Sequence, residues 1–162
     1  MLLSPDEVKE SDIADSVIVH AGSCSLSASP VAEATVKALK TGHNLGKLVS
    51  FDVNYRNLMW KDDQQACADA VKAILPYVDI LKISEEEVEM LGGQENIQNL
   101  MKENQITMVV ETLGSEGALA YLGENVIQVA GRKVKAVDAT GAGDAFWGAF
   151  LSSLRIQGVE KN

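Results

Sequence analysis

Short apolar runs alternate along this chain with longer segments whose apolar residues recur at helical spacing. Continuous apolar runs predict buried strands, and apolar residues three or four positions apart predict helices with one apolar face. The predicted strands are residues 17–20, 48–52, 79–83 and 106–111. The predicted helices are residues 29–42, 63–75, 84–91 and 95–104.

The ends of these helices carry local signals. Ser29 followed by Pro30 predicts an N-cap with proline at the first helical position. Gly42 is a natural stop for that helix, and Pro76 lies just beyond the end of the next one. These boundaries make each helix long enough to cross back over a sheet.

The last third of the chain changes pattern. Two short runs, 118–122 and 126–129, are joined by a tight polar connection and predict a hairpin. Residues 143–157 alternate small and large apolar side chains, and we expect a buried helix there. Strands that alternate with helices predict parallel pairing. We therefore expect residues 1–162 to form a single α/β domain with a doubly wound, mainly parallel sheet.

Composition narrows the class of protein. A net charge of −9 disfavours binding to nucleic acid or to an anionic membrane, and we expect neither as a partner. No apolar run is long enough to span a bilayer. Cys24 and Cys67 are far apart and surrounded by apolar residues, which is typical of buried thiols in a reducing compartment. We expect a cytoplasmic location.

The stretch at 138–150 carries the candidate chemistry. Gly141, Ala142 and Gly143 enter a helix, where free backbone N–H groups and the helix dipole can hold an anion. Asp144 follows in the first turn and could accept a proton from a hydroxyl that attacks phosphorus. We call Gly141–Gly143 the anion hole. The structural alternative is a glycine-rich helix start that Asp144 stabilises.

This stretch, Asp138-Ala-Thr-Gly-Ala-Gly-Asp144-Ala-Phe-Trp-Gly-Ala-Phe, resembles the second signature of the PfkB (ribokinase-like) carbohydrate kinases. That signature reads Asp-Thr-Thr-Gly-Ala-Gly-Asp-x-Phe-x-Gly-Ala, and Ala139 is a departure from it that we expect to affect packing only. The resemblance implies that Asp144 is the catalytic base. It also implies that Asp138 helps to bind an activating monovalent cation such as K⁺, although an ordinary loop or capping acid is the alternative.

Residues 52–60 resemble the Asp-Pro-Asn-x-Arg-x-x-Leu-Trp stretch of fructokinases and 2-keto-3-deoxygluconate kinases, with Val53 in place of proline. The resemblance implies that Asn54 contacts the sugar and that Arg56 clamps the transferring phosphoryl group, because guanidinium pairs well with phosphate oxygens. A surface ion pair is the alternative for Arg56. Trp60 is expected in the core or in a pocket wall.

Other segments follow in the order of the family. Glu87 lies where the family carries Asn-x-x-Glu, which implies that it orients Mg²⁺ through water; Ser84 with Glu87 is equally a capping box. The stretch from Thr112 to Gly117 resembles the nucleotide loop, with contacts to ATP from Thr112, Gly114, Ser115 and Gly117; a glycine turn is the alternative. Gly22 and Ser23 resemble a Gly-Ser pair near the sugar.

The resemblance implies ATP-dependent phosphorylation of a sugar hydroxyl, most like fructokinase. Members of the family are considerably longer, and the strands, β lid and sugar contacts of their amino-terminal part have no counterpart here. We therefore expect a partial domain with negligible activity alone. We also expect its exposed apolar surface to be covered, either by self-association or by the remainder of a longer chain. A non-catalytic nucleotide-binding or scaffold domain is the alternative. The chain has no Walker A loop or dinucleotide fingerprint.

Overall fold

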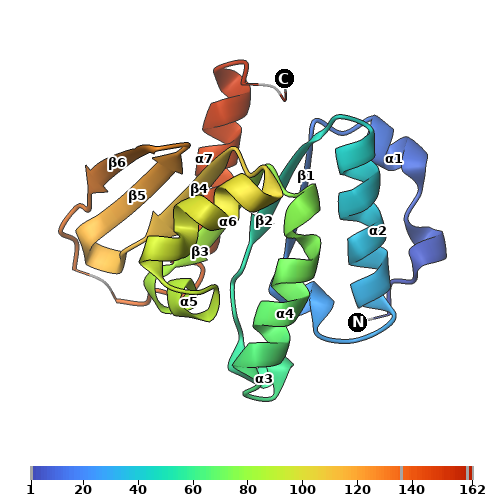
Figure 1. Ribbon diagram of the computed structural model, residues 1–162, viewed down its shortest axis with the longest axis horizontal. Coiled ribbons are helices and arrows are strands. Elements are labelled where there is room, and N and C mark those ends of the chain that lie inside the picture. Colours follow the sequence, from blue (N-terminus) through green and yellow to red (C-terminus); the bar gives the residue numbers. More distant parts are fainter. Residues whose placement is uncertain (1, 136, 160, 162) are drawn as a thin grey trace.

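A single mixed sheet runs through the centre of the molecule with its strands in the order β1-β2-β3-β4-β5-β6 (Figure 1). The computed structural model describes residues 2–135, 137–159 and 161. The strands are β1 (Ile18–Gly22), β2 (Leu48–Asp52), β3 (Ile80–Ser84), β4 (Met108–Thr112), β5 (Gly117–Leu122) and β6 (Asn125–Ala130). Pairing is parallel from β1 to β4 and antiparallel from β4 to β6. The predicted mainly parallel α/β fold and its hairpin are confirmed.

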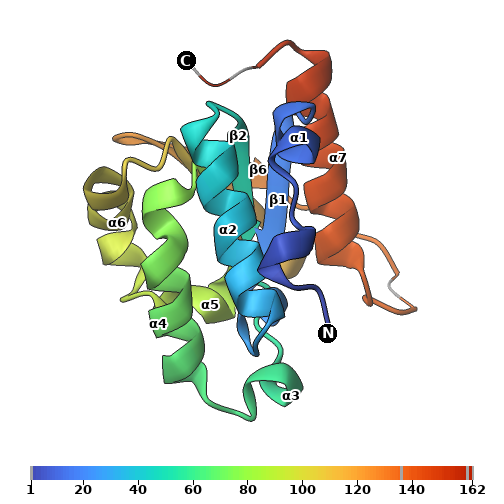
Figure 2. The same ribbon diagram turned by 90° about the vertical axis from the view of Figure 1, so that its right-hand side faces the viewer.

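Helices cover both faces of this sheet. They are α1 (Glu10–Ala14), α2 (Val31–Asn44), α3 (Asn57–Trp60), α4 (Gln64–Ile74), α5 (Glu85–Met90), α6 (Ile97–Asn104) and α7 (Ala142–Ile156). Short 3-10 turns occur at Pro5–Glu7, Ser23–Leu26, Leu75–Tyr77, Gln94–Asn96 and Gly114–Glu116. Helices α2, α4 and α6 lie on one side, and α7 lies on the other (Figure 2).

The alternation of side chains along β2 gives each face its own core. Val49 and Phe51 are fully buried in the larger cluster, with side chains from α2, α4 and α6. Leu48 belongs to a smaller cluster that packs against Trp147 and Leu151 of α7. A strand buried on both faces reads as a continuous apolar run, which is why the sequence pattern located β2 so well.

Two predicted features of α2 are wrong. Gly42 does not end the helix, which continues to Asn44. Gly42 is buried, and a Cβ there would lie 2.7 Å from Cγ2 of Val19, so glycine allows α2 to approach β1 closely. Ser29 is not the N-cap; the helix begins at Val31 after Pro30, and the Ser29 hydroxyl donates to Oε1 of Glu33 at 2.6 Å.

Helix α7 is present as predicted, but it is not buried all round. Only Trp147 and Leu151 of its described side chains are buried, whereas Phe146 is 39% exposed. The apolar pattern continues around the helix, but the described residues cover only the side that faces the sheet. No helix among the described residues is long and apolar enough to cross a membrane.

Candidate active site

The carboxyl ends of the parallel strands and the start of α7 meet at one end of the sheet. Asn54 follows β2, and its Nδ2 lies 3.4 Å from Oδ1 of Asp144 in the first turn of α7. Asn54 has a φ of 40°, in the left-handed region that asparagine tolerates better than most residues. The structure therefore brings together a predicted substrate residue and the predicted base.

The residues predicted to form the anion hole lie at the start of α7. Gly141 is the N-cap of α7 with a φ of 75°, a conformation that favours glycine, and it supplies no side-chain cap. The N–H of Ala142 donates to the carbonyl of Ala139 at 3.1 Å. With no capping side chain from Gly141, the next amides of the turn are available to an anion at the positive end of the helix dipole.

A buried ion pair lies under this turn. Nζ of Lys82 on β3 donates to Oδ1 and Oδ2 of Asp52 on β2 at 2.9 and 2.8 Å. Both side chains are almost fully buried, at 6% and 4% exposure. Burial raises the pKa of the Asp52 carboxyl against the pull of Lys82, and the charge of Asp144 adds to the rise.

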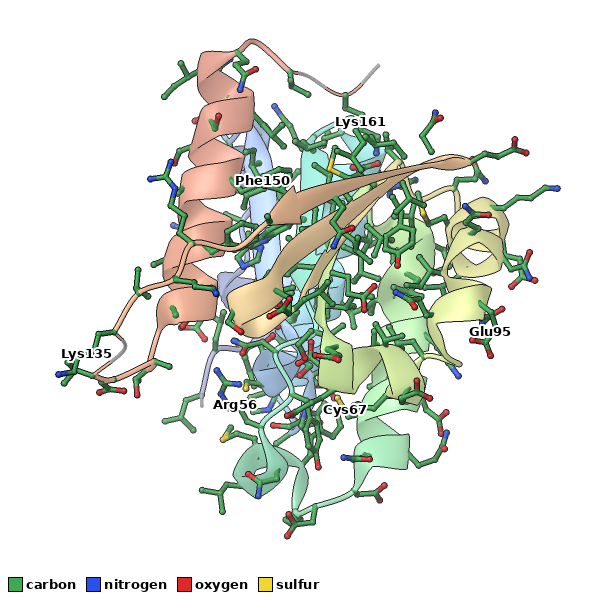
Figure 3. The ribbon with its side chains drawn as sticks, turned by 90° about the vertical axis from the view of Figure 1, so that its left-hand side faces the viewer. Arg56, Cys67, Glu95, Lys135, Phe150 and Lys161 are labelled. Carbon is green, nitrogen blue, oxygen red and sulfur yellow. The ribbon has the colours of Figure 1, made fainter. Side chains whose placement is uncertain are left out.

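An apolar cleft of about 480 Å³ opens between α7 and the β5–β6 hairpin. It brings together residues that the sequence assigned to nucleotide binding and to the anion hole, namely Thr112, Gly114, Gly117, Ala142 and Gly143. Phe146 and Phe150 form the α7 wall, and Figure 3 shows Phe150 on the side of α7 next to the hairpin. Gly141 and Ser115 are not part of the lining.

At Gly117 of the predicted nucleotide loop, both the backbone conformation and the surrounding space exclude a larger residue. Its φ is 107°, and a Cβ there would overlap the carbonyl oxygen of Val129 and the backbone of Gly131. Gly117 therefore has a structural reason to be glycine, because it forms the turn into the hairpin. Thr112 stands at the end of β4, and its hydroxyl lies 3.4 Å from the carbonyl of Ile83.

Glu87 serves a structural purpose. Its Oε1 accepts the N–H of Tyr55 at 2.6 Å, its Oε2 accepts the N–H of Ser84 at 2.8 Å, and the side chain is buried. Ser84 and Glu87 form the capping box of α5. Each carboxylate oxygen accepts one hydrogen bond and keeps a second lone pair, so the capping box is compatible with a contact to Mg²⁺ through water. Among the described residues, no group of three or more His, Cys, Asp or Glu side chains could hold a metal ion.

The remaining predicted residues differ in how accessible they are. Arg56 is exposed, and its Nη1 donates to the carbonyl of Tyr55 at 3.1 Å, near the loops at the ends of the strands (Figure 3). Asp138 is exposed, and its Oδ1 accepts the N–H of Thr140 at 2.8 Å, a bond that lowers the pKa of Asp138. Gly22 is half-buried. Ser23 is fully buried and accepts a bond from Nε1 of Trp60 at 3.4 Å, which places Trp60 in the core as predicted.

Sequence reasoning assigned no role to Lys82, Asp52 or Phe150. A signal for Lys82 was present, because a lysine within the apolar run Ile80-Leu-Lys-Ile83 must find a partner once the strand is buried. Asp52 at the same level of the neighbouring strand is that partner. Phe150 could not be told from any other apolar residue of its helix.

Comparison with known proteins identifies the class of protein that this fold and site define. Residues 2–157 match the model of the pfkB family carbohydrate kinases, and the chain belongs to that family. A probable fructokinase-5 from Arabidopsis thaliana is 35% identical over 162 residues, which are 98% of this chain and 50% of that protein. The chain thus spans about half the length of the curated relatives it matches.

Solved structures agree with this assignment. The fructokinase of Vibrio cholerae O395, bound to fructose, ADP and calcium ion, superposes with a TM-score of 0.81 and 32% identity, over 94% of this chain and 50% of that one. A putative ribokinase II from E. coli, in complex with ATP and Mg²⁺, gives a TM-score of 0.84 and 30% identity, over 95% and 50% of the two chains. The ribokinase-like fold predicted from the sequence is confirmed, as is its coverage of only part of those domains.

Proposed function

We propose that this chain is a single partial ribokinase-like domain that forms the nucleotide-binding, catalytic half of an ATP-dependent sugar kinase of the fructokinase type. The observation that carries the proposal is the position of Asp144. Its carboxylate stands in the first turn of α7, next to the amides of the anion hole and 3.4 Å from Asn54. An anion site beside a base is what in-line phosphoryl transfer requires.

In this proposal ATP lies along the apolar cleft. The adenine contacts the Phe146 and Phe150 wall, and the phosphates run past Thr112, Gly114 and Ser115 to the anion hole. Asp144 accepts the proton of the sugar hydroxyl, Arg56 clamps the transferring phosphoryl group, and Asn54 with Gly22 orients the sugar. Mg²⁺ arrives on the nucleotide phosphates, as is usual for this ion, and Glu87 orients it through water while its carboxylate also holds the loops at Tyr55 and Ser84.

Fructose or a keto-deoxy sugar acid is the proposed substrate class, because residues 52–60 resemble the corresponding stretch of fructokinases and 2-keto-3-deoxygluconate kinases; the fructokinases among the relatives favour fructose. Phosphoryl transfer depends mainly on positioning. We therefore expect the chain alone to phosphorylate fructose far below the roughly 1–100 s⁻¹ of ordinary kinases. Turnover in that range by the purified chain would contradict this division of labour.

The test is a calorimetric titration of ATP with Mg²⁺ into the purified chain and two variants. Gly143→Asp places a carboxylate in the anion hole and is expected to abolish binding. Asp144→Asn removes the base but leaves the amides, and is expected to keep the Kd within about threefold, or about 0.65 kcal/mol. If circular dichroism shows that the wild-type chain is folded but it binds no ATP, the proposal is wrong.

A second candidate is a non-catalytic nucleotide-binding domain, favoured by the half-length match to the relatives. The chain would then bind ATP, but substitution of Asp144 would not change the rate of any phosphoryl transfer. In a complete kinase that carries this half, Asp144→Asn should lower kcat about 10²- to 10⁴-fold if the residue is the base. An unchanged kcat would favour the second candidate.

A further inference from the structure

Lys82 is a buried cation in the middle of a central strand. Its neighbours on β3, Ile80, Leu81 and Ile83, are all buried apolar residues. Its ammonium makes both of its described hydrogen bonds to the two oxygens of Asp52. A buried ion pair seldom stabilises a fold more than well-packed apolar residues would, because both charges lose their hydration. Stability alone therefore does not explain why this buried pair is present.

The position of the ammonium supplies that reason. A Cβ built on Gly143 would lie 3.5 Å from Nζ of Lys82, so the charge sits directly against the backbone of the anion hole. Asp52 and Lys82 are direct partners in the register of β2 and β3, which fixes the height of the pair in the sheet. The two bonds to the carboxylate then hold Nζ beside the first turn of α7.

The charges around this turn are otherwise unfavourable to a phosphate. Asp144 stands in the turn itself, and its charge already raises the pKa of Asp52. Partial desolvation lowers the pKa of His20, which is exposed on the edge strand β1 and bonded to Ser50, so the neutral imidazole is favoured. Lys82 is the buried cation at the turn that offsets the two carboxylates. Charges in such a site interact more strongly than charges in water.

We propose that the Asp52–Lys82 pair is a positioning element of the phosphate site. Lys82 places a fixed positive charge behind the amides of Gly143 and Asp144, and Asp52 holds that charge in place. Lys82 acts through the anion hole and needs no contact of its own with substrate. The expected effect, tighter binding of the nucleotide phosphates, rests on the proposed function. The positive charge of Lys82 beside the turn is present in the free chain as well.

The test compares wild type with the double variant Asp52→Asn/Lys82→Met, which replaces both charges by neutral groups of similar size and leaves no unpaired charge. Lys161→Met is the matched control, because it removes an ion pair, to Asp79 at 2.8 Å, from the other end of the same strands. Lys82→Arg keeps the charge. Thermal unfolding and circular dichroism establish that each variant is folded.

Two readouts are measured. Calorimetry with Mg²⁺ and ATP should show about tenfold weaker binding in the double variant, because the pair is neutral overall but its ammonium end is the one that lies against Gly143. It should show wild-type affinity in Lys161→Met and near wild-type affinity in Lys82→Arg. Base-catalysed hydrogen exchange at the amides of Gly143 and Asp144, followed by NMR in the free chain, should be several-fold slower in the double variant, because hydroxide is no longer attracted there.

The outcomes separate this inference from the proposed function. If the wild type binds ATP and the double variant binds equally well, the positioning role is wrong and the proposed function stands. If the wild-type chain binds no ATP, the proposed function fails for this chain, and the exchange rates decide: slower exchange confined to the first turn of α7 supports the inference, whereas unchanged exchange overturns it. A global change in exchange would mean that the pair is structural only.

Discussion

Nδ2 of Asn54 lies 3.4 Å from Oδ1 of Asp144, although the two residues are 90 positions apart in the chain. Asn54 belongs to the loop after β2, and Asp144 to the first turn of α7. The contact forms because the loop turns through a φ of 40° at Asn54. One residue thus combines tolerance of the left-handed backbone with an amide donor for the proposed base.

Substitution of Asn54 should separate these two properties. Asn54→Ala loses both, and we expect it to lower the free energy of unfolding by about 1–2 kcal/mol, the cost of a left-handed conformation for alanine. Asn54→Gly keeps the backbone turn and loses only the contact, so its cost should be well under that of alanine. Urea denaturation of the two variants checks this. Equal costs would mean that the backbone conformation at this position carries no strain.

Two helical glycines should respond in opposite directions to the same substitution. Gly42→Ala places a Cβ 2.7 Å from Cγ2 of Val19 in the interface of α2 with β1. We expect a loss of about 1–3 kcal/mol from overpacking, despite the better helix propensity of alanine.

Gly148→Ala in α7 is the matched control, because a Cβ there meets nothing within 4 Å. We expect it to raise the free energy of unfolding by about 0.5–1 kcal/mol through helix propensity alone. Chemical denaturation of both variants gives the signs. A stable Gly42→Ala variant would show that α2 can move away from β1 at little cost.

The outcome at Gly42 also shows where sequence reasoning reaches its limit for the fold. Strand and helix positions follow from local periodicity, and the structure places β2 at the predicted 48–52. A glycine within a helix is locally ambiguous between a stop and a close contact, and only the packing of α2 on β1 decides. The exposure of Phe146 in α7 was likewise misjudged, because periodicity reports how apolar a helix is and not what covers it.

In the candidate site, the arrangement of residues that are adjacent in the chain was predictable. Contacts between residues that the sheet brings together from distant positions were not. The anion hole and Asp144 lie within one turn, so their arrangement follows from helix geometry. One Ser-x-x-Glu pattern fits both a cap and a metal site; the contacts of Glu87 to Tyr55 and Ser84 show the cap, and its contact to Mg²⁺ through water stays a prediction. The Asp52–Lys82 pair joins residues 30 positions apart and depends on strand register.

A buried polar cluster ties the hairpin to β4. The Tyr121 hydroxyl donates to Oε2 of Glu111 at 2.7 Å, and Nε2 of Gln94 lies 3.2 Å from Oε2 of Glu111 and 3.1 Å from the Tyr121 hydroxyl. Tyr121→Phe removes a donor from a buried carboxylate. We expect a loss of about 1–3 kcal/mol in the free energy of unfolding. Tyr77→Phe, at a half-buried phenol outside this cluster, should cost less; an equal loss in both would contradict the role of the cluster.

The same tyrosine predicts an alkaline limit to stability. Burial and the bond to Glu111 raise the pKa of Tyr121 to about 12. Because the folded pKa lies above the ordinary value of 10.0, the contribution to stability is complete below pH 10 and is lost as pH rises towards 12. Denaturation curves at pH 9 to 12 should fall more steeply for wild type than for Tyr121→Phe. Parallel curves would show that Tyr121 titrates normally.

His20 predicts the opposite dependence at acid pH. Its Nδ1 lies 3.0 Å from Oγ of Ser50, which also accepts a bond from Nε1 of Trp147 at 2.9 Å, so the imidazole is linked to α7. Burial lowers the pKa of His20 below 6.5, Lys82 adds to the fall, and Ser50 and Asp144 oppose it. A depressed folded pKa means that the contribution to stability is present above pH 6.5 and is lost as pH falls through the folded value. NMR titration should therefore give a His20 pKa below 6.5. The decline in unfolding free energy on acidification should be shallower in His20→Gln, and a His20 pKa at or above 6.5 would contradict the partial desolvation of this ring.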